Sequence, residues 1–483
     1  IPTVMSSKKT SSKRGNKEFS FSFVLSVLSA FFGALFSFLA AKFLEAETYG
    51  EIQYYISIVT LLSSFMLFGV DSFLIKNAQF EDNQQQLLSK SIVFVFAIST
   101  LILPIYAGIG YSFLSRLHQK SGLIFFVFVI AFLLSLSSLG GAFLQSKNKY
   151  HLRLFLTSFI PHILFLAIFG IHYLTGTLNA FIKFYLLYYC LVYGTFGVVV
   201  TIKCLFPLAD FFSNSQIKGI IFFGLTWVLY NITTPLSTIF IGEKYDDLGI
   251  AGIFSISNQL LTISGLATGI ISQISNTTFA KYAKQNDVER LFLNYERITR
   301  INMYVAVPFF AAFIIEAQNI MKFFGDSYLG HNAILILLTI SALIECVTGP
   351  CGTILLMGGK EKENFIASIV KFITFMVVLL SLIRFTELAA PIGLVASSIM
   401  SNTIKLIILR VSFKKNFFSL KILLTFVALF SISAATFFGL SFIQNTLIWA
   451  VSNAFCGIAL IIGFILLTPF ENDKKYFSKG KEI

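Results

Sequence analysis

Three carboxylates stand inside long apolar stretches of the chain, where charge is costly. Glu345 lies near the middle of one stretch, Glu316 lies nearer the end of another, and Asp71 lies close to the end of a third. A carboxylate in low-dielectric surroundings can hold a proton. We therefore predict ion coupling at Glu316 and Glu345, with a protonated side chain hydrogen-bonded between helices as the alternative. Asp71 either lines a polar cavity or meets the membrane interface.

Four lysines lie within such stretches or at their ends. Lys371 and Lys405 fall inside them, within reach of one face, and Lys42 and Lys183 fall near the opposite face. An ammonium group acts as a point charge that attracts an anionic ligand. All four are therefore candidate ligand-binding residues. The alternative left open is that their long side chains only extend to the aqueous interface.

The sequence carries none of the common catalytic or metal-binding motifs. It contains no G-x-S-x-G, no Walker A motif and no H-E-x-x-H. Its cysteines form no C-x-x-C pair, so the sequence supports neither a zinc site nor a disulfide framework. They are Cys190, Cys204, Cys346, Cys351 and Cys456. We expect a protein that is not an enzyme and that uses no cofactor and no metal.

The composition indicates that lipid is the main solvent of this chain. Hydrophobic residues make up 56% and charged residues 12%, and the mean hydropathy is +0.82, whereas soluble domains carry about 25% charged residues. These values exclude an ordinary soluble enzyme and a disordered chain. The net charge of +13 has no basic soluble domain to carry it, so we predict no nucleic-acid partner.

Fourteen apolar runs are long enough to span a bilayer core about 30 Å thick. They are 19–44, 52–75, 91–114, 123–144, 154–174, 180–202, 219–242, 250–275, 301–323, 332–357, 365–385, 389–409, 422–443 and 447–468. The sequence therefore predicts an all-α polytopic membrane protein. About three quarters of its Lys and Arg residues fall on one side of this arrangement, which predicts cytoplasmic termini.

The segments between the spans are short. We expect basic cytoplasmic tails over 1–18 and 469–483 and a cytoplasmic linker over 203–218. The longest loop, 276–300, is basic and amphipathic, which predicts either a helix lying on an anionic inner leaflet or a plain connector. The outward loops are too short for the large external domain on which polytopic glycosyltransferases and polysaccharide polymerases usually build catalysis.

The two halves of the chain resemble each other. Spans begin at 19 and again at 219. Gly141–Lys149 and Gly352–Lys362 each begin within a glycine-containing span and end in K-x-K. Because six spans is an even number, the repeats run in the same direction. We predict two parallel, pseudo-symmetric six-helix lobes, 19–202 and 219–409, around a central cavity. Two extra helices follow over 422–468.

The order and spacing of several motifs resemble those of a known family. The motifs are Glu47–Gly50 (ETYG), Leu67–Val70 (LFGV), Gly252–Gln259 (GIFSISNQ), Phe323–Tyr328 (FFGDSY) and Gly349–Lys362 (GPCGTILLMGGKEK). The chain resembles the Wzx-type O-antigen flippases within the MATE-like (MOP) exporter superfamily. These members are usually drawn with twelve spans, whereas we count fourteen, as in the lipid II flippases.

The resemblance implies a cargo and partners. The cargo would be an undecaprenyl-diphosphate-linked oligosaccharide, carried from the cytoplasmic to the periplasmic leaflet of a bacterial inner membrane. A polysaccharide polymerase and a chain-length regulator are candidate partners. The lysines named above would attract the diphosphate, and the first two spans of each half would line the cavity. Candidate sugar contacts in those spans are Trp227, Asn231, Asn258, Gln259 and Gln273; ordinary packing or interhelical hydrogen bonding is the alternative for each.

Two other classes of protein remain as hypotheses. A MATE-like cation-coupled drug or small-molecule antiporter would favour an acidic cavity. A polytopic glycosyltransferase or polysaccharide polymerase would need a large outward loop with essential acidic residues.

Overall fold

The computed structural model describes residues 25, 28–77, 84–113, 121–147, 149–204, 212, 214–245, 247–443, 446–468 and 470. Within these ranges every regular element is a helix, which confirms the predicted all-α class. The predicted tail 1–18 lies outside the described residues, as do half of the residues of the linker 203–218 and all of the tail 469–483 except Phe470.

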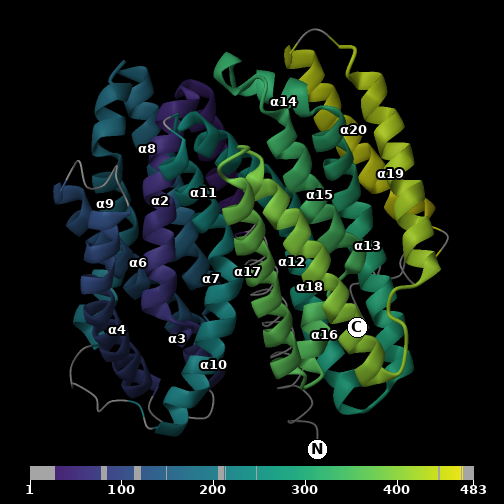
Figure 1. Cartoon of the computed structure of the whole chain (residues 1–483), viewed down its shortest axis with the longest axis horizontal. Helices are drawn as coiled ribbons and strands as arrows, with labels where there is room; N and C mark the ends of the chain where they lie inside the picture. The colour runs from purple at the N-terminus through teal and green to yellow at the C-terminus, as the bar shows by residue number, and fades with distance from the viewer. Residues whose placement is uncertain are drawn as a thin grey trace, which may run out of the picture. The chain divides into compact units, whose positions relative to one another are not determined.

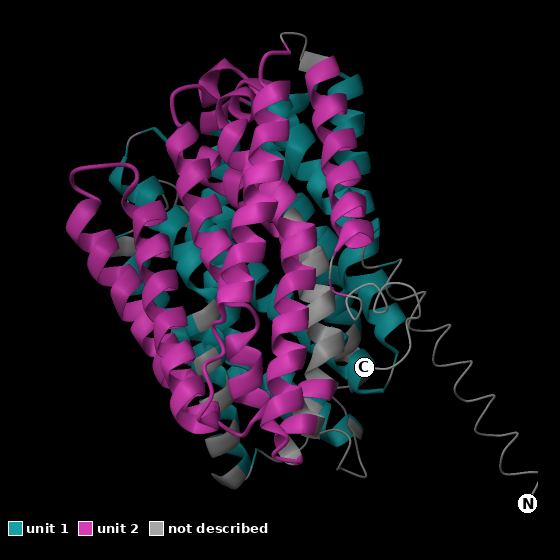
Figure 2. Ribbon diagram, turned by 90° about the vertical axis from the view of Figure 1, so that its right-hand side faces the viewer, with its two compact units in different colours: residues 1–44, 48–248 teal, residues 45–47, 249–483 magenta. Residues whose placement is uncertain are grey.

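The chain divides into two compact units, coloured separately in Figure 2. The first comprises residues 1–44 and 48–248, and the second comprises residues 45–47 and 249–483. This division places α10 and α11 with the first half, whereas we predicted a boundary near 203–218. Compact units need not coincide with sequence repeats, so the two predicted lobes stay a prediction.

Unit 1 is a bundle of helices, most of which are labelled in Figure 1. Its core is formed by Tyr54, Ile58, Val95, Ile130 and other buried apolar side chains. Its helices are Leu28–Phe43, α2 (Ala46–Leu67), α3 (Val70–Asn77), α4 (Gln84–Ser112), α6 (Ser121–Ser146), α7 (Tyr150–Leu154), the π-helical η1 (Phe155–Phe159), α8 (Ile160–Leu174), α9 (Leu178–Cys204), α10 (Asn214–Asn231) and α11 (Thr233–Lys244).

Unit 2 contains the remaining helices. α15 packs against α12, α13 and α18; α17 packs against α18; and α19 and α20 both pack on α13. Its helices are α12 (Gly249–Lys284), α13 (Val288–Ile315), α14 (Ala317–Phe324), the 3-10 helix η2 (Asp326–Tyr328), α15 (Asn332–Thr348), α16 (Cys351–Met357), α17 (Glu361–Leu382), α18 (Ala389–Phe413), α19 (Leu420–Leu440) and α20 (Thr446–Leu467).

Every predicted span overlaps one or more helices, so the protein is a multi-pass membrane protein. In the described part of the chain, nine helices are long and apolar enough to cross a bilayer, or ten if a bent pair counts as one span. The predicted number of fourteen is therefore not confirmed. The other predicted spans fall on helices that are short, interrupted or described only in part.

Several predicted spans are broken rather than continuous. The span 52–75 divides at Phe68 and Gly69, which both have positive φ values, 41° and 72°. A Cβ at Gly224 of α10 would overlap the Phe68 carbonyl oxygen and ring, so the glycine lets α10 approach the break closely. The span 219–242 divides at Ile232, and 301–323 divides at Glu316.

The span 332–357 is broken in its middle and bent by 46° between α15 and α16. Gly349 adopts φ 65° and ψ −165°, a region open almost only to glycine, and Pro350 follows it. The break frees the Thr348 carbonyl oxygen. That oxygen accepts hydrogen bonds from the Tyr295 hydroxyl at 2.6 Å and from Cys351 Sγ at 2.8 Å. These bonds hold the bend against α13.

Residues 276–300 do not form one separate helix. α12 continues to Lys284, and α13 begins at Val288 after a short turn. Asp287 caps α13 by accepting a hydrogen bond from the Arg290 backbone N–H at 3.0 Å, which stabilises a helix start there. The segment therefore consists of two helix ends joined by a short turn, and its relation to the inner leaflet stays a prediction.

Candidate functional site

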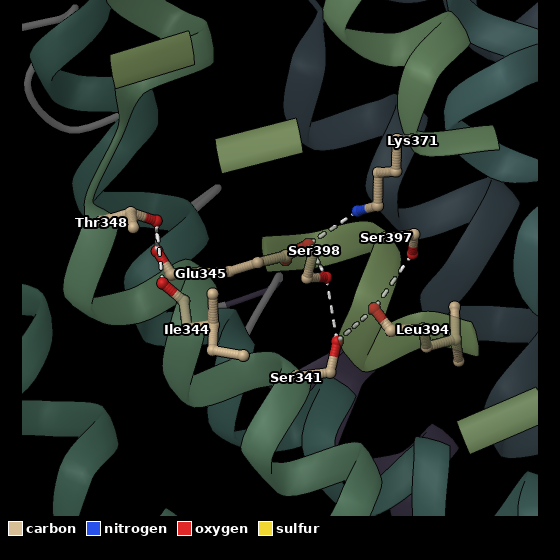
Figure 3. Close-up of polar contacts among 8 residues, drawn as sticks. All are labelled: Ser341, Ile344, Glu345, Thr348, Lys371, Leu394, Ser397 and Ser398. Carbon is tan, nitrogen blue, oxygen red and sulfur yellow. Dashed lines mark hydrogen bonds and ion pairs between the residues drawn. The ribbon is translucent and has the colours of Figure 1, made fainter. Parts of the chain in front are cut away.

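An ion pair lies inside unit 2, where three transmembrane helices meet (Figure 3). Lys371 Nζ of α17 donates to Glu345 Oε1 of α15 at 2.7 Å, and Ser398 Oγ of α18 donates to the same oxygen at 3.2 Å. The Lys371 side chain is 19% exposed and that of Glu345 is 47% exposed. An ionised pair within a span is costly unless it faces a bundle interior or a wet cavity. The carboxylate is thus paired, yet open on one side.

A short network of serines fixes the carboxylate's neighbours. Ser341 Oγ lies 2.9 Å from Ser398 Oγ and donates to the Leu394 carbonyl oxygen at 3.3 Å. Ser397 Oγ donates to the same carbonyl oxygen at 3.0 Å. Small residues let helices approach closely in a membrane, so these serines bring α15 and α18 together. Ser398 itself is buried, which leaves it little freedom to leave the carboxylate.

Lys405 of α18 supplies a second ammonium group near the ion pair. Lys371 and Lys405 both act electrostatically on Glu345. In the described part of the chain Lys405 makes no hydrogen bond or ion pair. A Cβ at Gly352 of α16 would lie 3.7 Å from Lys405 Nζ and 3.2 Å from Asn364 Oδ1. The glycine therefore places no side chain against this ammonium group.

The cluster of Glu345, Lys371 and Lys405 carries two positive charges and one negative charge. Its net positive charge suits an anionic ligand better than a cationic one. Among the described residues, no group of three or more His, Cys, Asp or Glu side chains is arranged to hold a metal ion. Ammonium and carboxylate groups at this spacing can bind charged ligands and exchange them.

Glu316 occupies a different place, at the junction of α13 and α14. Its Oε2 accepts hydrogen bonds from Asn319 Nδ2 at 2.7 Å and from Trp449 Nε1 of α20 at 3.0 Å. The side chain is 1% exposed, and its Oε1 is buried with no hydrogen bond. These contacts tie α20, one of the two extra helices, to the rest of unit 2. Ion coupling at Glu316 stays a prediction.

Replacing Trp449 by phenylalanine is expected to lower the stability of unit 2 by about 1–3 kcal/mol, because a buried carboxylate loses a donor. Thermal unfolding in detergent measures this change. Trp227→Phe is the matched control. Trp227 is the second of the two tryptophans in the sequence, and within the described residues its side chain donates no hydrogen bond. Equal midpoints for the two variants would show that the Glu316 contact does not stabilise the protein.

The other candidate residues are dispersed over both units. Lys42 and Lys183 are exposed, near the end of helix Leu28–Phe43 and within α9. Asp71 lies in the first turn of α3, with Oδ1 buried and not hydrogen-bonded. Trp227 packs against the core of unit 1, and Asn231 Nδ2 donates to its carbonyl oxygen at 2.9 Å.

The remaining three belong to α12. Asn258 and Gln259 are half-buried, and neither side chain makes a hydrogen bond within the described residues. The side chain of Gln273 lies outside the described residues. Of the candidate residues, the structure therefore brings together Glu345, Lys371 and Lys405. Sugar contacts at the neutral residues stay predictions.

Sequence reasoning missed the polar partners of the ion pair. Ser341 and Ser398 were not singled out, because serines are common in transmembrane helices. The sequence did hold one signal for a polar helix face. Ser397 and Ser398 are followed by Asn402 and Lys405 in the same apolar stretch. The Lys371 side chain pairs with Glu345, a contact that the alternative of extension to the aqueous interface did not include.

The comparisons with known proteins agree with this architecture. Residues 38–332 match the sequence model of a family described as polysaccharide biosynthesis protein. No curated protein sequence matches the chain. A solved structure of the lipid II flippase MurJ in an inward closed conformation is similar, with 14% identity and a TM-score of 0.68 over 95% of this chain and 99% of that one.

Two structures of a multidrug resistance MATE family transporter of the MOP superfamily are also similar. The inward-facing one has 13% identity and a TM-score of 0.57, and covers 82% of this chain and 97% of that one. The outward-facing one has 12% identity and a TM-score of 0.54, and covers 82% and 96%. The chain thus shares its fold with these three structures. Because the family match spans more than half of the chain, the protein belongs to the polysaccharide biosynthesis protein family.

Proposed function

We propose that the protein is a flippase for an undecaprenyl-diphosphate-linked oligosaccharide, an O-antigen or related polysaccharide repeat unit. It moves this lipid from the cytoplasmic to the periplasmic leaflet of a bacterial inner membrane, with both of its own termini in the cytoplasm. Family membership and the fold shared with a lipid flippase support this proposal.

The cationic cluster of unit 2 is the observation that carries the proposal. A diphosphate head group needs compensating positive charge wherever it leaves water, and each unsatisfied polar group in hydrocarbon costs several kcal/mol. Lys371 and Lys405 place two ammonium groups within the membrane-spanning part of the chain, beside one carboxylate. Such a cluster can hold the head group while the polyprenyl tail stays in lipid.

Translocation of this kind needs no covalent chemistry. The proposal assigns Lys42, Asp71 and Lys183 to the path of the head group and the neutral polar residues of α10 and α12 to its sugars. Alternating access between the two halves moves the cargo, with an ion gradient or the membrane potential supplying the energy. Glu345 and Glu316 are the proposed coupling residues, and a polymerase and a chain-length regulator are the proposed protein partners.

The test is the sidedness of the lipid-linked oligosaccharide in cells that lack the gene. We expect the lipid to accumulate in the cytoplasmic leaflet, where reagents applied to the outside of spheroplasts cannot modify its sugars. Expression of the intact chain should restore modification. An unchanged distribution between the leaflets after deletion would contradict the proposal.

A cation-coupled antiporter is the second candidate, because the fold is shared with multidrug transporters. That function predicts that the deletion strain becomes more susceptible to cationic drugs while its surface polysaccharide stays normal. The net positive charge of the cluster around Glu345 disfavours a cationic ligand.

A further inference from the structure

We propose that the Glu345 carboxylate competes with the anionic ligand for the Lys371 ammonium group. The carboxylate pairs with Lys371 until a diphosphate displaces it, and we call it the tethered competitor. The inference rests on the proposed function only in naming a lipid diphosphate as the natural ligand. Its structural basis is the contact of a carboxylate, an ammonium group and a serine hydroxyl in Figure 3.

The carboxylate stands where a phosphate oxygen would bind. Glu345 Oε1 accepts hydrogen bonds from Lys371 Nζ at 2.7 Å and from Ser398 Oγ at 3.2 Å. Ammonium and hydroxyl groups donate equally well to carboxylate and phosphate oxygens. A phosphate oxygen can therefore take the place of the carboxylate oxygen on both donors.

The competitor is held in place and yet accessible. Ser398 is buried and keeps the carboxylate on the α18 side, whereas nearly half of the Glu345 side chain is exposed, at 47%. A fully buried pair would exclude an incoming anion. An open pair allows direct exchange, in which the ligand's oxygen arrives as the carboxylate leaves.

Lys405 provides the landing point for such an exchange. It makes no ion pair within the described residues, and Gly352 places no side chain against its Nζ atom. A diphosphate has two phosphate groups, so one can bind Lys405 while the other competes for Lys371. Lys371 and Lys405 are close enough to influence each other electrostatically.

Competition of this kind affects release as much as binding. A side chain attached next to its partner has a high effective concentration, so it returns to Lys371 when the ligand's hold weakens. The carboxylate thereby lowers the affinity of the cluster and speeds departure of the cargo. Removing it should give tighter binding and slower turnover.

The test compares anion binding by the purified full-length chain and its Glu345→Gln variant. Isothermal titration with inorganic pyrophosphate should give on the order of tenfold tighter binding to the variant, because one repulsive charge and one competitor are lost. Ser398→Ala should give a smaller increase in the same direction. Lys371→Gln introduced into the Glu345→Gln variant should abolish the gain. Glu345→Asp, with its shorter side chain, serves if the glutamine variant does not fold.

A second arm distinguishes the lipid head group from free phosphate as the source of the anion. A polyprenyl diphosphate in detergent micelles should show the same gain as pyrophosphate, and inorganic phosphate a smaller one. If only inorganic phosphate binds the Glu345→Gln variant more tightly, the ligand is not a diphosphate. Equal or weaker pyrophosphate binding by the folded Glu345 variants would overturn the competitor.

The inference and the proposed function can fail separately. If deletion traps the lipid in the cytoplasmic leaflet but Glu345→Gln does not change pyrophosphate binding, the protein is a flippase in which Glu345 does not compete with the ligand. Tighter pyrophosphate binding by the variant with no leaflet phenotype on deletion leaves an anion-regulated transporter of another cargo.

Discussion

Replacing Lys371 by glutamine is expected to reduce transport of the lipid-linked oligosaccharide by at least about 100-fold, the scale of a lost buried charge partner. The change removes one of two ammonium groups and leaves Glu345 without its 2.7 Å partner. The cluster then changes from net positive to neutral. Surface polysaccharide in a complemented deletion strain measures the loss. Because Glu345 is half exposed, the cost in stability should stay near 1–3 kcal/mol.

Two controls separate a local effect from a general one. Lys371→Arg keeps the positive charge and should retain most of the activity. Lys322→Gln removes an exposed lysine of α14 and should leave transport unchanged. Wild-type output from the Lys371→Gln variant, expressed at an equal level, would remove the cluster from the mechanism.

Replacing Gly349 by alanine should destabilise unit 2 by about 2–5 kcal/mol. Backbone strain at its φ of 65° and ψ of −165° contributes about 1–3 kcal/mol. Overpacking adds a similar amount, since a Cβ there would overlap Thr299 Oγ1 and lie 3.1 Å from the Tyr295 ring. The bend lies one helical turn after Glu345, so transport should fall along with the unfolding midpoint.

A matched glycine and a second-site change test this explanation. A Cβ at Gly439 of α19 has nothing within 4 Å, so Gly439→Ala should have little effect. Adding Thr299→Ala to Gly349→Ala removes the overlapping atoms and should recover part of the stability. If both glycine variants unfold at the same temperature, the bend is not maintained by Gly349.

Hydrophobic patterning predicted the helices well because a span must pair all its backbone groups internally. It did not predict the breaks at Phe68–Gly69 and Gly349. Breaks depend on tertiary partners, such as the Tyr295 hydroxyl that pairs with the Thr348 carbonyl oxygen. A run of apolar residues looks the same whether or not such a partner stands beside it.

The candidate site was predicted in composition but not in arrangement. Costly charges within apolar stretches identified Glu345, Lys371 and Lys405 separately. Their meeting depends on the rotation of α15, α17 and α18 about their axes, which small residues such as Ser398 set through packing. Glu316 was found by the same reasoning, yet its contacts with Trp449 and Asn319 come from a helix junction that periodicity does not reveal.

The most direct measurement is leaflet exchange of a fluorescent undecaprenyl-diphosphate oligosaccharide in vesicles containing only the purified protein. Vesicles with the intact chain should expose the labelled lipid to an external quencher much faster than protein-free vesicles. Vesicles with Lys371→Gln and Lys405→Gln combined should match the protein-free rate. Exchange by the intact chain no faster than in empty vesicles, or undiminished exchange by the double variant, would contradict this account.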